Sequence, residues 1–247
     1  MSSRRIPAGS PACTILALAI ACGAAGPSQA AARDMQAYAK QSLQKTSAAN
    51  HSVRSKPAGA TVTYLKVFKT SYPEYVEIKV NESGTGTFDI RQLDEQPNPQ
   101  PFQLGEPMAQ KIFDLSAKLH YFQGEDLNVH HRLANLGQKT FRYEKSDEKF
   151  ETTFNYTLNP TATELQNIFE GLARQEGDLS DLKRTMKYDR LGVNDVLLQI
   201  ENDYNNRLLP EPELLLPALD QLAADQTYLD IARQRARTLA SHIRGGR

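Results

Sequence analysis

The sequence has no tryptophan and only two cysteines in 247 residues. Both cysteines, Cys13 and Cys22, lie inside the N-terminal segment that we interpret below as a signal peptide. A chain processed after that segment would have neither a redox-active thiol nor a disulfide bridge. Its stability would come from burial of apolar surface, for which a chain of this length is sufficient.

The short motifs of common enzyme classes are also missing. The sequence contains no G-x-S-x-G elbow, P-loop, H-E-x-x-H or C-x-x-C, and no G-x-G-x-x-G after a predicted strand. Gly84 and Gly86 fit a hairpin turn rather than a nucleotide site. We therefore predict no catalytic residues and no cofactor, and an enzyme is the less favoured class.

An excess of charge of either sign is absent as well. The chain has 29 Lys and Arg against 29 Asp and Glu, and 40% of its residues are hydrophobic. This balance lacks the strongly basic signature of a nucleic-acid binder, and the hydrophobic content argues against general disorder. A globular protein of one or two domains is expected.

The N-terminus has the order of a secretory signal. Arg4 and Arg5 precede an uncharged apolar run at residues 12–21, after which Gly, Pro and Ser appear. This run is about half the roughly 20 residues that a membrane-spanning helix needs, so removal is the better interpretation. We predict a signal peptide over residues 1–32 and a secreted or periplasmic protein.

Two kinds of processing compete. Residues 28–30 (SQA) and 30–32 (AAA) both place small residues where a signal peptidase inspects them. Cleavage after Ala30 or Ala32 would give a free chain that starts near Ala31 or Arg33. The alternative is lipidation of Cys22, because residues 18–23 (LAIACG) resemble a bacterial lipobox, although Ala19 stands where Leu is commoner. Only that alternative would bring the protein to a membrane, as a lipid-anchored component of the cell envelope.

The rest of the chain divides by pattern into three parts. Residues 33–59 are rich in Ala, Ser, Gln and Lys without a sustained apolar period, which is typical of a flexible tether. Residues 60–176 carry both strand and helix patterns, and residues 177–247 carry helical patterns only. We expect a sheet domain followed by a C-terminal helical region.

The predicted sheet domain has a weak ββα duplication. Strands are expected at 61–69, 74–80, 87–92, 139–144 and 150–157, with Phe141 and Tyr143 meeting Phe150, Phe154 and Tyr156 on one face. Helices are expected at 108–122 and after the Asn159-Pro160 cap. The Pro-rich residues 94–107 are interpreted as a rigid crossover loop, with a docking ligand as the alternative. The fold class is α+β, a two-layer antiparallel sheet with both helices on one face.

Three apolar stripes follow, and they predict a C-terminal helical hairpin or small bundle. The stripes are Val193, Leu197, Ile200 and Tyr204; Leu215, Leu216, Leu219 and Leu222; and Ile231, Ala232, Ala236, Leu239 and Ile243. The last stripe is accompanied by five arginines, Arg233, Arg235, Arg237, Arg244 and Arg247. Acidic residues dominate 201–230, so pairing between these helices explains the arginines better than a lipid or an acidic partner does.

One cluster of residues has the chemistry of a metal site. His120, Glu125, Asp126, His130 and His131 carry ligand types suited to a divalent cation. Adjacent His130 and His131 would point to opposite faces in a strand, and no recognised ligand spacing is met. We favour a polar loop with surface histidines, and keep a metal-assisted hydrolase as the alternative function.

Four aromatic residues, Tyr64, Phe68, Tyr72 and Tyr75, fall close together at the first predicted hairpin. Packing in the core is the favoured interpretation, and a carbohydrate or peptide groove is the alternative. Taken together, the sequence predicts an exported, non-enzymatic envelope protein. Its expected partner is another envelope or secreted protein, bound through the sheet edge or the C-terminal helices, and no nucleic acid.

Overall fold

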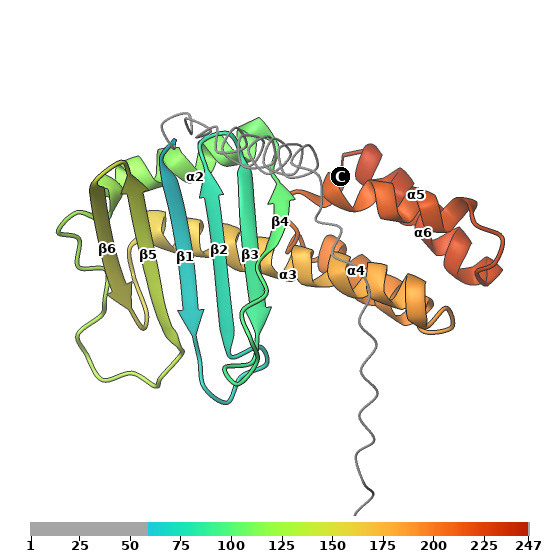
Figure 1. The fold of residues 1–247 in the computed structure, drawn as a ribbon, viewed down its shortest axis with the longest axis horizontal. Coiled ribbons are helices and arrows are strands. Elements are labelled where there is room, and N and C mark those ends of the chain that lie inside the picture. The colour runs from blue at the N-terminus through green and yellow to red at the C-terminus, as the bar shows by residue number, and fades with distance from the viewer. Residues whose placement is uncertain (1–58, 247) are drawn as a thin grey trace, which may run out of the picture. The chain divides into compact units, whose positions relative to one another are not determined.

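The computed structural model describes residues 59–246. The predicted signal peptide, its cleavage positions Ala30 and Ala32, the lipidation candidate Cys22 and the tether residues before Gly59 lie outside this range. Within it, six strands form one antiparallel sheet in the order β4-β3-β2-β1-β5-β6 (Figure 1). The strands are β1 (Thr61–Val67), β2 (Tyr75–Asn81), β3 (Thr85–Arg91), β4 (Gln100–Gln103), β5 (Gln138–Lys145) and β6 (Glu148–Phe154).

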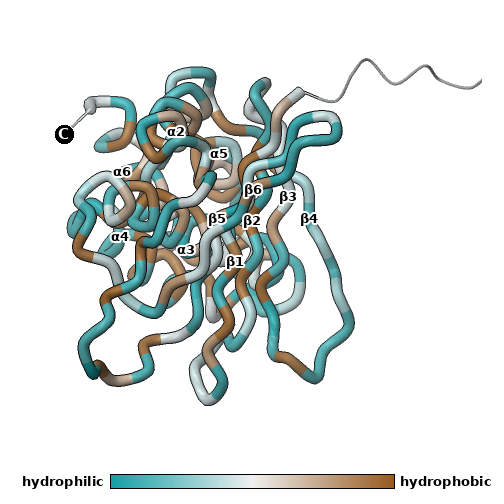
Figure 2. The backbone as a smooth tube through the Cα atoms, turned by 90° about the vertical axis from the view of Figure 1, so that its left-hand side faces the viewer, coloured by the Kyte–Doolittle hydropathy of each residue, from teal (hydrophilic) through white to brown (hydrophobic). Residues whose placement is uncertain are grey.

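The helices confirm the α+β class. They are α2 (Glu106–Lys118), α3 (Pro160–Tyr188), α4 (Val193–Asn205), α5 (Leu216–Ala224) and α6 (Asp230–Arg244), with short 3₁₀ turns η1 (His120–Phe122) and η2 (Pro212–Leu215). Both α2 and α3 lie on one face of the sheet (Figure 2). The hairpin β2–β3 precedes α2 and the hairpin β5–β6 precedes α3, with β1 between the hairpins at the centre of the sheet. The last two helices, α5 and α6, form the C-terminal hairpin.

Alternation along the strands places the core between the sheet and these two helices. In β2, Val76, Ile78 and Val80 are buried, while Tyr75, Glu77 and Lys79 face the other side. Tyr64 on β1 stands opposite Ile78 and Phe141, and its ring stacks on Phe169 of α3 with 5.4 Å between centroids. The period-two pattern of the strands therefore meets the helical stripe of α3 in one aromatic layer.

Some local predictions need correction. The Pro-rich connection contains β4, which pairs with β3 at the edge of the sheet, where Pro101 is tolerated because one side of the strand has no partner. The helix predicted over 108–122 ends at Lys118 and is followed by η1, in which Tyr121 has a φ of 52°. Tyr156 lies beyond the end of β6 and, like Ile231, is exposed.

The long helix α3 connects the two hydrophobic clusters of the described chain. Asn159 caps it, its side-chain oxygen accepting hydrogen bonds from the backbone N–H groups of Thr161 (2.9 Å) and Ala162 (3.2 Å). Residues 162–172 pack on the sheet, and Leu179, Leu182 and Met186 pack with α4, α5 and α6. The helix passes through the predicted boundary at residues 176 and 177 without interruption. None of the helices between residues 59 and 246 has both the length and the apolar character to cross a bilayer.

Candidate functional site

Four of the five predicted metal-ligating residues form two separate pairs, and the fifth, His131, is exposed. His120 Nδ1 lies 2.7 Å from Glu125 Oε1, and His130 Nε2 lies 2.8 Å from Asp126 Oδ2. Both histidine side chains are about three-quarters exposed, at 77% and 75%. The hydrogen bond from His130 is the main reason that the pKa of Asp126 is lowered. No group of three or more His, Cys, Asp or Glu side chains suited to a metal ion occurs within residues 59–246. The five residues therefore do not converge into one set of ligands in the described part of the chain.

The C-terminal arginines pair within the helical region, as predicted from the acidic residues before them. Arg235 contacts Glu201, Arg244 contacts Asp220, and Arg233 lies 3.1 Å from Asp230. Arg237 donates to the backbone oxygen of Ala223 at 2.9 Å. These interactions within the protein account for four of the five arginines of the cluster. The fifth, Arg247, lies outside the described residues.

A groove lies between α3 and the segments that join β1 to β2 and β3 to β4. Figure 1 shows these two connections at the same end of the sheet. It consists of two adjoining cavities of about 440 and 520 Å³. The cavities share Tyr72, Pro73, Ile90, Gly177 and Asp181. We call this hollow the α3 groove. It is the candidate functional site.

The carboxylate of Glu74 holds the two loops that form one wall of the groove. It accepts a hydrogen bond from the backbone N–H of Thr70 (2.8 Å) in the β1–β2 connection and another from that of Leu93 (3.3 Å) in the β3–β4 connection. These two backbone donors are the main causes of the lowered pKa of Glu74. The β1–β2 connection is further closed by Ser71 Oγ, which donates to the Phe68 oxygen at 2.7 Å.

Three of the four aromatic residues singled out in the sequence line this groove. Tyr64, Phe68 and Tyr72 contribute to its first cavity, whereas Tyr75 lies on the open face of the sheet with Arg91 stacked 4.1 Å from its ring centroid. Tyr64 is fully buried and belongs to the core, while Tyr72 is 92% exposed at the rim. The packing interpretation therefore holds for Tyr64, and Phe68 and Tyr72 line the cavity.

Two glycines on α3 meet different surroundings. A Cβ atom on Gly171 would approach Pro210 to 2.7 Å and the Leu208 oxygen to 2.9 Å, so close packing requires a glycine there. A Cβ atom on Gly177 would meet nothing within 4 Å, because that side of the helix faces the groove. A glycine inside a helix destabilises it by about 0.5–1 kcal/mol relative to alanine. Packing gives no reason for Gly177.

Carboxyl groups dominate the first cavity. Glu170 accepts hydrogen bonds from the Tyr64 hydroxyl (2.9 Å) and the Lys66 ammonium (3.1 Å). Burial is the largest cause of the raised pKa of Tyr64, followed by the charge of Glu170 and the hydrogen bond to it. Glu170, Tyr64 and Lys66 therefore satisfy one another.

Asp178 and Asp203 form a pair of carboxyl groups in the same cavity, and this pair lacks a full set of hydrogen-bond donors. Asp203 on α4 is only 4% exposed and accepts hydrogen bonds from Gln199 (3.0 Å) and, at 3.5 Å, from Arg174. Asp178 Oδ2 is buried and has no hydrogen-bond donor among the described residues. Burial, then the charge of Asp203 and the hydrogen bond to it, raise the pKa of Asp178 to about 7. A proton shared with Asp203 would supply the missing donor.

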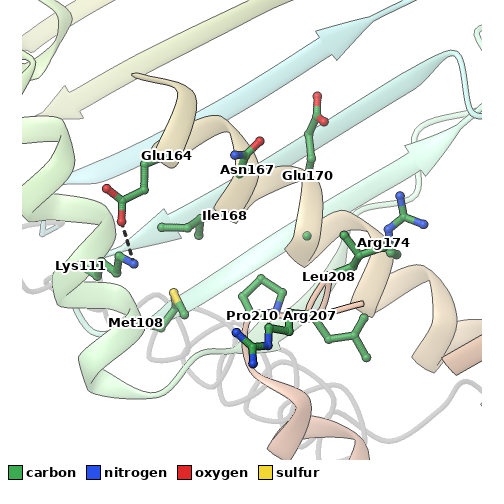
Figure 3. A pocket seen from close by; sticks show the side chains of 12 residues that line it. Met108, Lys111, Glu164, Asn167, Ile168, Glu170, Arg174, Arg207, Leu208 and Pro210 are labelled. Carbon is green, nitrogen blue, oxygen red and sulfur yellow. Dashed lines mark ion pairs between the residues drawn. The ribbon is translucent and has the colours of Figure 1, made fainter. Parts of the chain in front are cut away.

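Another cavity, of about 600 Å³, lies on the other side of α3, against α2 and the 207–210 segment (Figure 3). Its Lys111 and Glu164 pair at 2.8 Å. Glu170 and Arg174 point away from Arg207 and Pro210 in this view. Gly171 in its wall is explained by the contact with Pro210. We therefore place the candidate site in the α3 groove, where Gly177 and Asp178 have no such explanation.

Sequence reasoning did not find Asp178, Asp203 or Glu170. Asp178 and Asp203 are on different helices, and only the antiparallel packing of α3 with α4 brings them together. The available signal was Gly177, an isolated glycine in a helical pattern. No protein-family model matches the chain, and no curated protein is significantly similar to it.

Proposed function

We propose that this chain is an exported cell-envelope protein that binds a peptide segment of another envelope or secreted protein in the α3 groove. The observation that carries the proposal is Gly177. An interior glycine costs helix stability, and the space beside it is open to the groove. A ligand backbone that approaches α3 closely would account for the absence of a side chain there.

The lining of the groove supports a peptide as the ligand. Phe68, Val76 and Ile90 provide apolar surface, and the amides of Gln92, Gln96, Asn98 and Gln100 line the second cavity. Primary amides both donate and accept hydrogen bonds, so they suit the alternating N–H and C=O groups of an extended chain. Apolar lining with a few polar groups is the usual composition of a binding site.

The edges of the sheet are less suitable than the α3 groove for binding a peptide, because neither edge readily accepts an added strand. Edge strand β4 has four residues, and Pro101 cannot donate a backbone hydrogen bond. At the other edge, residues 125–129 already bond to β6 and the residues after it: Thr152 Oγ1 donates to the Glu125 oxygen at 2.7 Å, and Val129 N donates to the Tyr156 oxygen at 3.0 Å. We therefore assign the partner surface to the groove in place of a sheet edge.

Export and the partner class rest on the sequence pattern of residues 1–32. An apolar run behind Arg4 and Arg5 with small residues before Ala30 and Ala32 supports secretion or a periplasmic location. Lipidation at Cys22 remains the alternative form of the mature protein. In either form, the expected partners are proteins outside the cytoplasm.

The proposal is tested by selecting random twelve-residue peptides, displayed on phage, against the exported protein. The dissociation constants of the selected peptides are then compared for the natural protein, Gly177→Leu and Ser241→Leu. The leucine side chain introduced by Gly177→Leu would project into open groove space without a clash at its Cβ, and Ser241 is an exposed residue on α6, outside the groove. Gly177→Leu should weaken binding at least about tenfold, equivalent to about 1.4 kcal/mol, and Ser241→Leu should leave it unchanged. Equal binding by Gly177→Leu, or failure to select any peptide, would overturn the proposal.

A further inference from the structure

The α3 groove has more carboxyl groups than cations near Gly177. Its first cavity is lined by Glu170, Asp178, Asp181 and Asp203 on the acidic side. The cations of the same cavity are Lys66 and Arg174. A ligand that enters this end of the groove therefore meets a surplus of negative charge.

Both cations of the cavity already pair with carboxyl groups other than that of Asp178. Lys66 lies 3.1 Å from Glu170, and Arg174 lies 3.5 Å from Asp203. Asp181 pairs with Arg184 at 2.9 Å. This leaves Asp178 as the carboxyl of the cavity without a cation among the described residues, next in sequence to Gly177 and with its buried Oδ2 lacking a donor.

We propose that the α3 groove recognises a basic side chain of the bound peptide, arginine or lysine, and seats its cationic group against Asp178 and Asp203. The inference rests on the proposed function and adds the chemistry of the ligand. The exposed ring of Tyr72 and the side chain of Phe68 line the approach to this position and can contact the aliphatic part of the basic residue. A cation supplies both the donors that Asp178 lacks and a positive charge that stabilises its carboxylate, whereas a neutral side chain supplies donors at most.

Binding of the cation should release a proton. The groups that face Asp178 are Asp203 from α4, then Glu170, Arg174 and Asp181 from its own helix, and Tyr64 and Lys66 from β1 across the cavity. In the empty groove, Asp178 holds a proton for part of the time near neutral pH, because burial and the charge of Asp203 raise its pKa to about 7. When the cation arrives, the proton passes to solvent and both carboxylates are charged. Affinity for a basic peptide must then fall as the pH is lowered through 7.

The test uses a selected peptide that binds in the groove and contains no histidine, in two forms with arginine or neutral citrulline at the position in question. Dissociation constants are measured at pH 6 and pH 8 for the natural protein, Asp178→Asn and the control Asp195→Asn, which changes an exposed residue in the first turn of α4 outside both cavities of the groove. At pH 8 the natural protein should bind the arginine form on the order of tenfold more tightly than the citrulline form. From pH 8 to pH 6 its affinity for the arginine form should fall roughly tenfold, with little change for citrulline. Asp178→Asn should lose both effects, and Asp195→Asn should keep them.

The inference and the proposed function can fail separately. Peptides that bind in the groove without a preference for arginine over citrulline, or with an equal preference in Asp178→Asn, would overturn the inference and leave peptide binding intact. Binding that is insensitive to Gly177→Leu would overturn the proposed function itself. If Asp178→Asn does not fold, the comparison of arginine and citrulline at the two pH values in the natural protein still decides the question.

Discussion

The carboxylate of Glu74 accepts a hydrogen bond from the backbone N–H of Leu93 across 19 residues of sequence, at 3.3 Å. A second bond, from Thr70, joins the same carboxylate to the β1–β2 connection. One side chain thus links the two connections that form a wall of the α3 groove. The shape of the groove depends on a residue that does not face the ligand.

Replacing Glu74 should therefore alter the pH dependence of stability. The pKa of Glu74 is lowered from its ordinary value of 4.5. Its stabilising contribution is complete above about pH 4.5 and is lost as the pH falls through the lowered pKa. In urea unfolding, the natural protein should have a larger free energy of unfolding than Glu74→Gln at pH 7, and this difference should become smaller toward pH 3. A difference that does not change with pH would contradict this role of the charge.

The two glycines of α3 should respond oppositely to alanine. Gly177→Ala should stabilise the protein by about 0.5–1 kcal/mol, because alanine is the better helix former and its Cβ meets open space. Gly171→Ala should destabilise it by about 1–3 kcal/mol, because the Cβ would press against Pro210 and the Leu208 oxygen. Urea unfolding monitored by circular dichroism measures both, and a change of the same sign in both variants would contradict this account.

Asp178 should oppose folding at alkaline pH. The pKa of Asp178 rises from an ordinary value of 3.8 to about 7 in the folded protein, so the folded state binds more protons than the unfolded state between these values. Stability attributable to this group therefore falls as the pH rises from about 4 to 7 and stays low above 7. Asp178→Asn should be more stable than the natural protein at pH 8.5, with a smaller advantage at pH 5. Urea unfolding curves of both proteins at the two pH values measure this difference in stability. If the advantage of Asp178→Asn were larger at pH 5 than at pH 8.5, the predicted role of Asp178 would be wrong.

Much of the fold could be predicted because the apolar periods are local. The alternation of Val76, Ile78 and Val80 identified β2, and the Asn159-Pro160 pair identified the start of α3. The edge strand β4 could not be predicted, since its Pro101 argues against a strand until an unpaired edge is known. The full length of α3 could not be predicted either, because a glycine at position 177 suggests that the helix is interrupted. Leu179 and Leu182 stabilise the second half of the helix through contacts with other helices, and these contacts are not visible in the sequence.

The candidate site was harder to predict from the sequence than the fold was. The histidine and acidic residues around His120 were candidates for a metal site because of their residue types. In the structure, four of them form two separate surface pairs, His120 with Glu125 and His130 with Asp126. Asp178 and Asp203 have no motif spacing that would connect them. The raised pKa of Asp178 arises from burial and from the charge of Asp203, and both depend on the packing of α3 with α4.

The most direct test of the central claim is amide hydrogen exchange of the exported protein with and without a saturating concentration of a selected peptide. Binding in the α3 groove predicts slower exchange in residues 68–74 and 92–100 and in the adjoining part of α3, around Gly177. Exchange in α5 and α6 should be unchanged. Slowing confined to the C-terminal hairpin or to the open face of the sheet, with residues 68–74 and 92–100 unaffected, would contradict the assignment of the groove as the binding site.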